Sequence, residues 1–309
     1  MSGEADFLDR LRALAGDPAA RGLADDVAVL PTTGEQLVLT ADMLVEGVHY
    51  RADDPPEAVG WKLAAVNLSD LAAKGARPRA CLFGHALTGN AAWDAAFLEG
   101  LGAALAAYDM PLIGGDTVAL PAGAPRVLTL MAVGAVAAGV AVPSRAGAQP
   151  GDVLYLSGPV GDAGAGLALL TAGLGAPAAL IEAYRRPRPH LAQGLALAAR
   201  AHAMMDVSDG LLIDARRMAE VSSCAVVIEA VPLSADYAGL RGSSVESRLA
   251  AATAGDDYVL LAALPPDLPP PEGMLRVGHC AKGAGLSVVL DGVSVRLPAR
   301  LGYEHAAGA

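Results

Sequence analysis

The sequence predicts an α/β protein of two domains, for three reasons. Its 309 residues exceed the size that one hydrophobic core usually supports. Short apolar runs typical of strands alternate with longer segments that have helical periodicity. A segment with two prolines and two glycines, residues 143–151, separates two such halves. We therefore expect an N-terminal domain at 1–142 and a C-terminal domain at 143–309.

The first half opens with a predicted helix at residues 4–15 and a β-hairpin. Apolar runs at 27–30 and 37–40 surround a turn that contains Pro31 and Gly34. Antiparallel pairing would bring the two ends of this hairpin together. Three carboxylates lie at these ends: Asp25, Asp26 and Asp42.

The next helix ends at Gly75 and changes character along its length. It begins with an apolar stripe, but the same face then carries Asn67, Asp70 and Lys74. A carboxylate that points into a protein needs a positive partner. Lys74 is one candidate for Asp70, and a divalent cation shared with other aspartates is the second.

The remainder of the first half predicts a mixed sheet with one more helix. Apolar runs indicate strands at 80–87, 111–116 and 127–142, and residues 93–108 predict a helix. Asp116 follows two glycines at the end of a short strand, where the backbone can approach a ligand closely.

The second half predicts another mixed sheet covered by helices. A strand at 153–157 leads through a glycine-rich loop into a helix; such a loop can bind an anion or simply connect the two elements. The segment MMDVSDG places Asp206, Ser208 and Asp209 before a helix, so Ser208 or Asp209 could also be its N-cap. Further helices are expected at 190–202 and 211–222, and further strands at 225–229, 258–264, 275–279 and 286–290.

Composition limits the classes of partner. The net charge of −11 argues against non-specific binding to nucleic acid or to an anionic membrane, and no membrane span is expected. The three scattered cysteines and the absence of a signal-peptide pattern favour a reducing, cytoplasmic setting. The sequence has no Walker A loop, dinucleotide fingerprint or protein-kinase catalytic loop. Phosphate binding would therefore depend on arginines or on aspartate-bound magnesium.

Six motifs in chain order closely resemble those of thiamine-monophosphate kinases. They are LTADMLVEGVHY, NLSDLAAKGARP, YDMPLIGGDT, SRAGAQPGD, DVSDGLLIDA and AGDDY, and they extend over nearly the whole chain. The resemblance implies the two-domain fold of the aminoimidazole ribonucleotide synthetase-like superfamily. In that fold the N-terminal sheets of a homodimer form a barrel, and ATP and substrate bind in clefts between domains.

The resemblance also implies a role for individual residues. Magnesium would be held by Asp26, Thr40, Asp42, Asp70, Asp116, Asp206 and Asp209, of which Asp42, Asp70, Asp116 and Asp209 would be catalytic. ATP would contact Gly115, Asp116, Arg145 and Ser208, and thiamine monophosphate would lie beside His49, Asp256 and Tyr303. The expected reaction is ATP- and magnesium-dependent formation of thiamine diphosphate by direct in-line transfer.

Three departures from the family pattern affect these expectations. Ala24 replaces a glycine, Ala41 replaces a threonine that precedes the strand aspartate, and Asp256 replaces a longer glutamate. Without the resemblance, His49 reads equally well as a surface residue and Tyr303 as ordinary packing, and the arginines at 185, 186 and 188 read as a solvated loop. The alternative functions are an aminoimidazole ribonucleotide synthetase and a non-catalytic nucleotide-binding protein.

Overall fold

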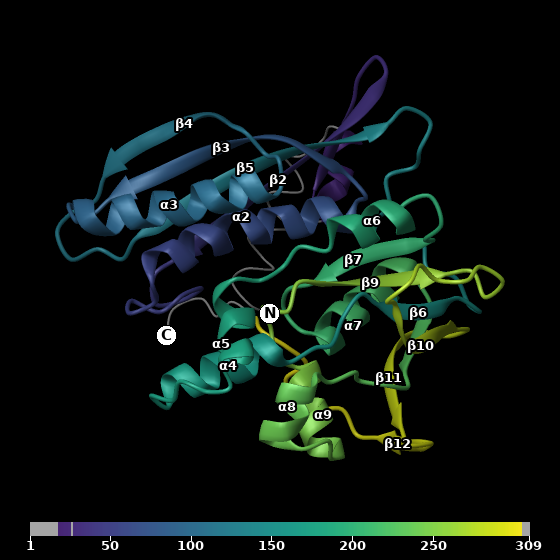
Figure 1. The fold of residues 1–309 in the computed structure, drawn as a ribbon. Coiled ribbons are helices and arrows are strands. Elements are labelled where there is room, and N and C mark those ends of the chain that lie inside the picture. Colours follow the sequence, from purple (N-terminus) through teal and green to yellow (C-terminus); the bar gives the residue numbers. More distant parts are fainter. Residues whose placement is uncertain (1–17, 26, 305–309) are drawn as a thin grey trace.

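The computed structural model describes residues 18–25 and 27–304. Within these ranges the chain forms two mixed β-sheets with helices packed on them, which confirms the predicted fold class (Figure 1). The helix expected at 4–15 and the side chain of Asp26 lie outside the described residues. The sheets fall on either side of residue 142; the domain boundary itself stays a prediction.

The first sheet has five strands in the order β1-β2-β5-β3-β4. Only β3 and β4 are parallel neighbours; the other pairs are antiparallel. Two helices, α2 and α3, lie along one face of the sheet (Figure 1). The bounds are β1 Ala28–Pro31, β2 Glu35–Val45, α2 Pro56–Ala73, β3 Arg77–Leu87, α3 Ala91–Ala107, β4 Leu112–Ala119 and β5 Val127–Ala137, after a short 3-10 helix at Pro18–Leu23.

The opposite face of the first sheet is apolar and exposed. Leu82 and Met131 are paired across β3 and β5, and Met131 is in turn opposite Ala41 on β2. Met43, two residues further on β2, shares this face because side chains alternate along a strand. Met43 and Met131 are 53% and 44% exposed. The side chains on this face are therefore not covered by another element of the chain in the described residues.

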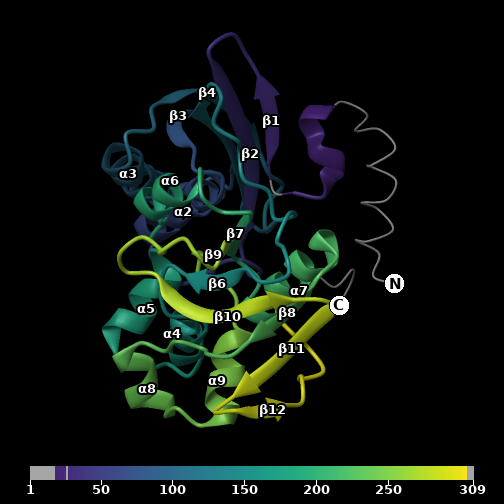
Figure 2. The same ribbon diagram turned by 90° about the vertical axis from the view of Figure 1, so that its right-hand side faces the viewer.

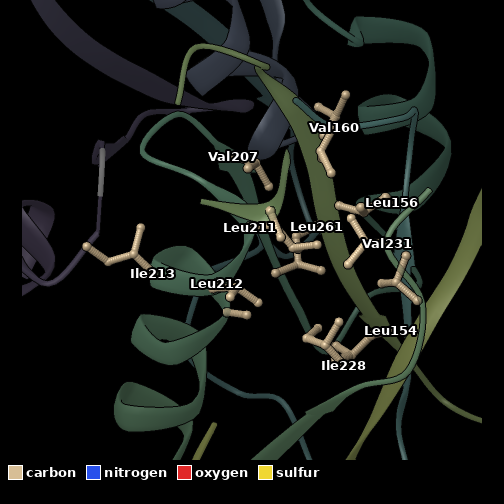
Figure 3. Close-up of a cluster of buried hydrophobic side chains, with 14 of the residues drawn as sticks. Leu154, Leu156, Val160, Val207, Leu211, Leu212, Ile213, Ile228, Val231 and Leu261 are labelled. Atoms are coloured by element: carbon tan, nitrogen blue, oxygen red, sulfur yellow. The ribbon is translucent and has the colours of Figure 1, made fainter. Parts of the chain in front are cut away.

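The second sheet has seven strands in the order β12-β11-β8-β10-β6-β9-β7. Its bounds are β6 Val153–Leu156, β7 Ala203–Val207, β8 Ala225–Ile228, β9 Val259–Leu264, β10 Leu275–Ala281, β11 Gly285–Leu290 and β12 Val293–Val295. The helices of this half are α4 Asp162–Thr171, α5 Ala178–Arg185, α6 Leu191–Leu197, α7 Leu211–Ser222, α8 Ala235–Arg241 and α9 Val245–Ala252. Leu154 and Leu156 of β6, Leu261 of β9 and Leu212 of α7 belong to one buried cluster (Figure 3).

Helix α2 is buried on nearly every side because it lies between the two halves. It packs against β2, β5 and α3 of the first half and against α6 and β7 of the second. In Figure 2, α2 and α6 lie between the first sheet and β9. This position explains why α2 buries Lys62, Asn67, Ser69 and Asp70, polar residues that an outer helix would turn to solvent. The polar end of α2 therefore faces the junction of the halves.

Most predicted elements are confirmed, with some differences. The helix expected at 190–202 is shorter, since α6 ends at Leu197. Helices α5, α8 and α9 and strands β7 and β12 were not predicted. Strand β7 is a run of only five residues, all buried. In the described ranges no helix combines the length and apolarity needed to cross a bilayer. The barrel across a dimer stays a prediction.

Candidate active site

A cavity of about 460 Å³ opens where the two halves meet. Strand β2 and helix α2 provide one wall, and α4, β7 and the loop after α9 provide the other. Nine of the predicted site residues line it: Thr40, Asp42, His49, Asp70, Asp206, Ser208, Asp209, Asp256 and Tyr303. Residues that are up to 263 positions apart in the sequence are thus brought to one cavity, as Thr40 and Tyr303 show.

Three carboxylates from three elements form the acidic part of the cavity. Asp42 comes from β2, Asp70 from α2 and Asp206 from β7, and the last two are only 8% and 4% exposed. Burial, together with repulsion from Asp206, raises the pKa of Asp42 to about 7. Burial and the neighbouring Asp42 and Asp206 raise the pKa of Asp70 well above its usual value, and burial raises that of Asp206. Burial and mutual repulsion therefore outweigh the positive charges of Lys74 and Arg145 nearby.

Hydrogen bonds orient two of these carboxylates. The Thr40 hydroxyl donates to Oδ2 of Asp70, and the Ser69 hydroxyl donates to Oδ2 of Asp206 at 2.6 Å. Both bonds leave the other carboxylate oxygen able to accept a ligand. At Asp42 the backbone is held instead, because its N–H donates to Asn67 Oδ1 at 3.1 Å. Sequence reasoning did not assign Ser69 a role, although it precedes Asp70 directly in the NLSD motif.

These residues fit magnesium, which prefers hard oxygen ligands. Three neighbouring carboxylates with raised pKa values are stabilised when a divalent cation offsets their mutual repulsion. Among residues 18–25 and 27–304, no three His, Cys, Asp or Glu side chains are grouped so that they could hold a metal ion by themselves. Magnesium is commonly bound by one or two carboxylates and completes its shell with water and substrate phosphates, so an open acidic site suits it.

Asp209 has a cationic neighbour. Arg217 of α7 donates to Asp209 Oδ2 at 2.5 Å and to Asp214 Oδ1 at 2.8 Å. Burial raises the pKa of Asp214 to about 7, and its Oδ2 accepts the Asp209 N–H. The N-cap of α7 is Gly210, which has no side chain, so the alternative that Ser208 or Asp209 caps this helix is wrong. The metal role of Asp209 stays a prediction.

Lys74 does not serve as the ion-pair partner of Asp70. Its ammonium is fully buried and donates instead to Asp25 Oδ1 at 2.6 Å. Burial alone would raise the pKa of Asp25, but Lys74 and Arg21 outweigh it and the pKa is lowered. Arg145 Nε lies 4.0 Å from the same Asp25 oxygen, and its charge lowers the pKa of Asp206 against the effect of burial. Arg145 thus borders the acidic part, although it does not line the cavity.

Gly115 and Asp116 lie elsewhere, on β4 at the edge of the first sheet. All eight residues of β4 are exposed, and neither predicted ligand lines the cavity. Asp116 Oδ1 accepts the N–H of Thr117 at 2.9 Å. Within one chain these two residues and the acidic cluster are therefore not brought together. Their predicted contacts to ATP and magnesium require something besides this cavity.

Apolar side chains also line the cavity. Met43, Val48 and Leu167 are 53%, 53% and 37% exposed. Tyr303 is 41% exposed, and its backbone N–H donates to the Asp209 oxygen at 2.9 Å. His49 Nδ1 accepts the Val45 N–H at 3.0 Å, which leaves Nε2 as the donor in the neutral ring. Apolar side chains of this kind can pack against aromatic rings, and the carboxylates can bind cations.

The glycine-rich loop before α4 is occupied by an internal anion. Asp257 accepts the N–H of Gly161 at 2.6 Å and that of Ala163 at 3.4 Å. Burial raises the pKa of Asp257 well above its usual value. Because a carboxylate of the chain already fills this N-terminus, the anion-site alternative for this loop is wrong. The second aspartate of the AGDDY motif was the sequence signal for it.

The sequence matches two family descriptions in order: "AIR synthase related protein, N-terminal domain" over residues 24–136 and "AIR synthase related protein, C-terminal domain" over residues 149–268. The Escherichia coli protein named thiamine-monophosphate kinase is 36% identical over 97% of this chain and 95% of its own. The Caulobacter vibrioides protein of that name is also 36% identical, over 94% and 86%.

The structure of "AaThiL complexed with AMPPCP and TMP" superposes with a TM-score of 0.87 and 30% identity, covering 98% of this chain and 97% of that one. Identity at this level over almost the full length of both chains shows common descent and a common fold. The chain belongs to the thiamine-monophosphate kinase family.

Proposed function

We propose that this chain transfers the γ-phosphoryl group of ATP to the phosphate of thiamine monophosphate, giving ADP and thiamine diphosphate. The observation that carries the proposal is the cavity, whose lining combines carboxylates with exposed apolar side chains. The related AaThiL structure contains AMPPCP, a nucleotide analogue, together with TMP. Two ligands that each combine phosphate with aromatic rings need both kinds of lining.

Asp42, Asp70 and Asp206 would hold magnesium, with Asp26, Thr40, Asp116 and Asp209 as the further ligands suggested by motif position. Bound there, magnesium would neutralise the charge of the phosphates that meet in the cavity. Thr40 and Ser69 hold Asp70 and Asp206 in fixed orientations, so these carboxylates need little reorganisation when the cation arrives.

The chain does not need a general base for this reaction. The attacking group is a phosphate monoester whose second pKa is about 6, so it is mostly a dianion at neutral pH. Catalysis of phosphoryl transfer depends mainly on alignment and on compensation of charge. The chain contributes alignment through Ser208, Gly115 and Arg145 at the nucleotide, and through His49, Asp256 and Tyr303 at thiamine monophosphate.

The functional unit in this proposal is a homodimer in the cytoplasm. The uncovered face of the first sheet and the exposed strand β4 provide a surface on which a second copy can complete a barrel. Such pairing would also place Gly115 and Asp116 beside a partner. The three cysteines are free and buried, in keeping with a reducing compartment.

The test is a coupled assay with purified full-length protein, ATP, magnesium and thiamine monophosphate. We expect ADP release that depends strictly on thiamine monophosphate, with thiamine diphosphate as the second product. Activity with formylglycinamidine ribonucleotide in its place would favour the aminoimidazole ribonucleotide synthetase reaction. Nucleotide binding without any turnover would favour a non-catalytic protein, and either result would overturn the proposal.

A further inference from the structure

Lys62 is a buried cation that contacts two residues of the cavity lining. It comes from the middle of α2, and its side chain is only 2% exposed. It is not a lining residue of the cavity. A lysine is rarely buried to this degree unless specific partners compensate the loss of hydration. The identity of these partners therefore indicates what the residue does.

The Lys62 ammonium joins the two halves of the protein at the predicted substrate residues. Nζ donates to the backbone oxygen of His49 at 3.0 Å and to Asp256 Oδ2 at 2.9 Å. His49 belongs to the first half and Asp256 to the second. The ammonium also lies 4.2 Å from the ring centre of Tyr184, a cation–π contact that stabilises the charge away from water.

The segment that carries Asp256 has an unusual backbone that needs such support. Asp256 and Tyr258 have φ values of 70° and 54°, in the left-handed region that residues with side chains seldom adopt. The N–H of Asp256 donates to the Ser208 oxygen at 2.7 Å, and the hydroxyl of Tyr258 donates to Asp256 Oδ1 at 3.0 Å. With Lys62 on Oδ2, both oxygens of this carboxylate are held from the protein side.

Asp256 nevertheless remains open to a ligand. Its side chain is 29% exposed and lines the cavity, and a carboxylate has about four acceptor positions, of which two are used. An oriented carboxylate can accept hydrogen bonds from an amino group and attract a cationic ring. The shorter aspartate arm, compared with the family's glutamate, makes its exact placement depend more strongly on what holds it.

We propose that Lys62 is a positioning residue for the thiamine-monophosphate end of the site: it fixes the Asp256 carboxylate and the His49 backbone relative to each other across the two halves. This inference rests on the proposed function. Lys62 touches neither the acidic cluster nor the predicted nucleotide contacts. Its removal should therefore weaken the use of thiamine monophosphate much more than the use of ATP.

The test replaces Lys62 in the full-length chain and measures steady-state kinetics for both substrates. In Lys62→Met we expect the KM for thiamine monophosphate to rise roughly 10- to 100-fold, the range that loss of a charge-assisted hydrogen bond produces, while the KM for ATP stays within about threefold. Lys62→Arg retains the charge and should recover most of this loss. If Lys62 served only to stabilise the fold, its replacement would lower Tm. It would then change both KM values or neither, rather than the KM for thiamine monophosphate alone.

A matched control lies at the same contact between the halves. Tyr184 donates its hydroxyl to buried Asp54 at 3.2 Å, and Arg185 donates to the same carboxylate at 2.9 Å. Tyr184→Phe removes the hydroxyl and keeps the ring beside Lys62. We expect it to lower Tm without changing the KM for thiamine monophosphate. An increase in that KM equal to the increase in Lys62→Met would show that any disturbance of the contact suffices, and would overturn the proposal.

If Lys62→Met does not fold, Asp256→Asn tests the same ion pair with Lys62 in place. A raised KM for thiamine monophosphate at an unchanged KM for ATP supports the proposal, and an unchanged KM for both overturns it. If both single variants fold, the double variant should lose less than the product of the two single effects, because the two residues share one ion pair. Failure of the function itself is distinguishable, since the unmodified chain would then show no activity with thiamine monophosphate.

Discussion

Strands β4 and β7 lie at the edges of their two sheets, and each carries an aspartate predicted to bind magnesium. Every residue of β4 is exposed, including Asp116. Every residue of β7 is buried, including Asp206, because α2 packs against it. Two similar pieces of sequence, a short apolar strand with an aspartate, thus end in opposite environments.

The difference teaches that tertiary cover, rather than local sequence, prepares a carboxylate for a cation. Burial raises the pKa of Asp206 and places it close to Asp42 and Asp70, so binding of a cation relieves an existing repulsion. Asp116 faces solvent in the single chain, so no comparable repulsion favours the binding of a cation there. In our proposal it acquires its cover only when a second copy pairs with the first sheet.

The largest effect is expected from the buried side of this comparison. Asp70→Asn and Asp206→Asn each remove a negative charge from the acidic cluster, and we expect kcat to fall roughly 10²- to 10³-fold. The fold should survive, because a neutral amide relieves the repulsion that burial creates. Steady-state assays and circular dichroism would measure the two quantities.

A control for the same experiment is Asp94→Asn. Asp94 is a carboxylate of α3 that is 17% exposed and whose Oδ1 lies 3.1 Å from His85 Nε2. It is remote from the cavity lining, so we expect kcat to stay within about twofold. Near-normal turnover in Asp70→Asn and Asp206→Asn would contradict the proposal that these carboxylates bind magnesium. It would also contradict the functional contrast between β7 and β4.

The exposed side can be tested by mixing two inactive variants. Suppose that each active site combines Asp206 of one subunit with Asp116 of the other. Asp116→Asn and Asp206→Asn then inactivate a site through different subunits. A mixed dimer then has one site with both aspartates intact. Because half of the dimers are mixed after refolding or co-expression, about a quarter of the unmodified activity should return.

The contrary result of the mixing experiment is equally informative. If Asp116 acted on its own chain's cavity, each chain of every mixed dimer would lack one ligand and no activity would return. Ile113→Lys gives an independent test. Ile113 is 67% exposed on β4, and a lysine there should prevent apolar pairing, giving a monomer by sedimentation and a loss of activity of roughly tenfold or more.

Much of the fold could be predicted from the sequence, and so could nine of the residues that line the cavity. The hairpin of β1 and β2 follows from two alternating runs around a turn with Pro31 and Gly34, and α7 follows from its helical periodicity. Strand β7 was missed because five buried residues between two helices give too short a pattern. Lys62 and Ser69 were missed because their roles depend on contacts with Asp256 and Asp206, far away in the sequence.

The partner of Lys74 could not be predicted from spacing for the same reason. Its position four residues after Asp70 suggested a helical ion pair, yet its ammonium lies on the side of α2 that meets Asp25. Local spacing offers only the neighbours on one helix. A helix packed between two halves has many more possible partners, from distant parts of the sequence. The buried Lys74 ammonium pairs with Asp25, which is buried beside it.

The smallest expected effect concerns stability and pH in the metal-free protein. The pKa of Asp42 is about 7 in the folded state, above its usual value near 4 when unfolded. At pH values between these two pKa values, the Asp42 carboxyl is therefore protonated in the folded state and ionised in the unfolded state. The stabilisation is complete below the unfolded pKa and is lost as pH rises through about 7. Without magnesium, Tm should fall by about 2–5 °C between pH 6 and pH 8.

Magnesium and two substitutions sharpen this last measurement. Saturating magnesium favours the ionised carboxylates, so it should raise Tm more at pH 8 than at pH 6 and flatten the dependence. Asp42→Asn should weaken the fall of Tm in the metal-free protein, whereas Asp116→Asn should leave it unchanged, since that side chain is exposed on β4. If the pH dependence of Tm were the same in the two variants, the titration of Asp42 would not be its cause, and this prediction would be wrong.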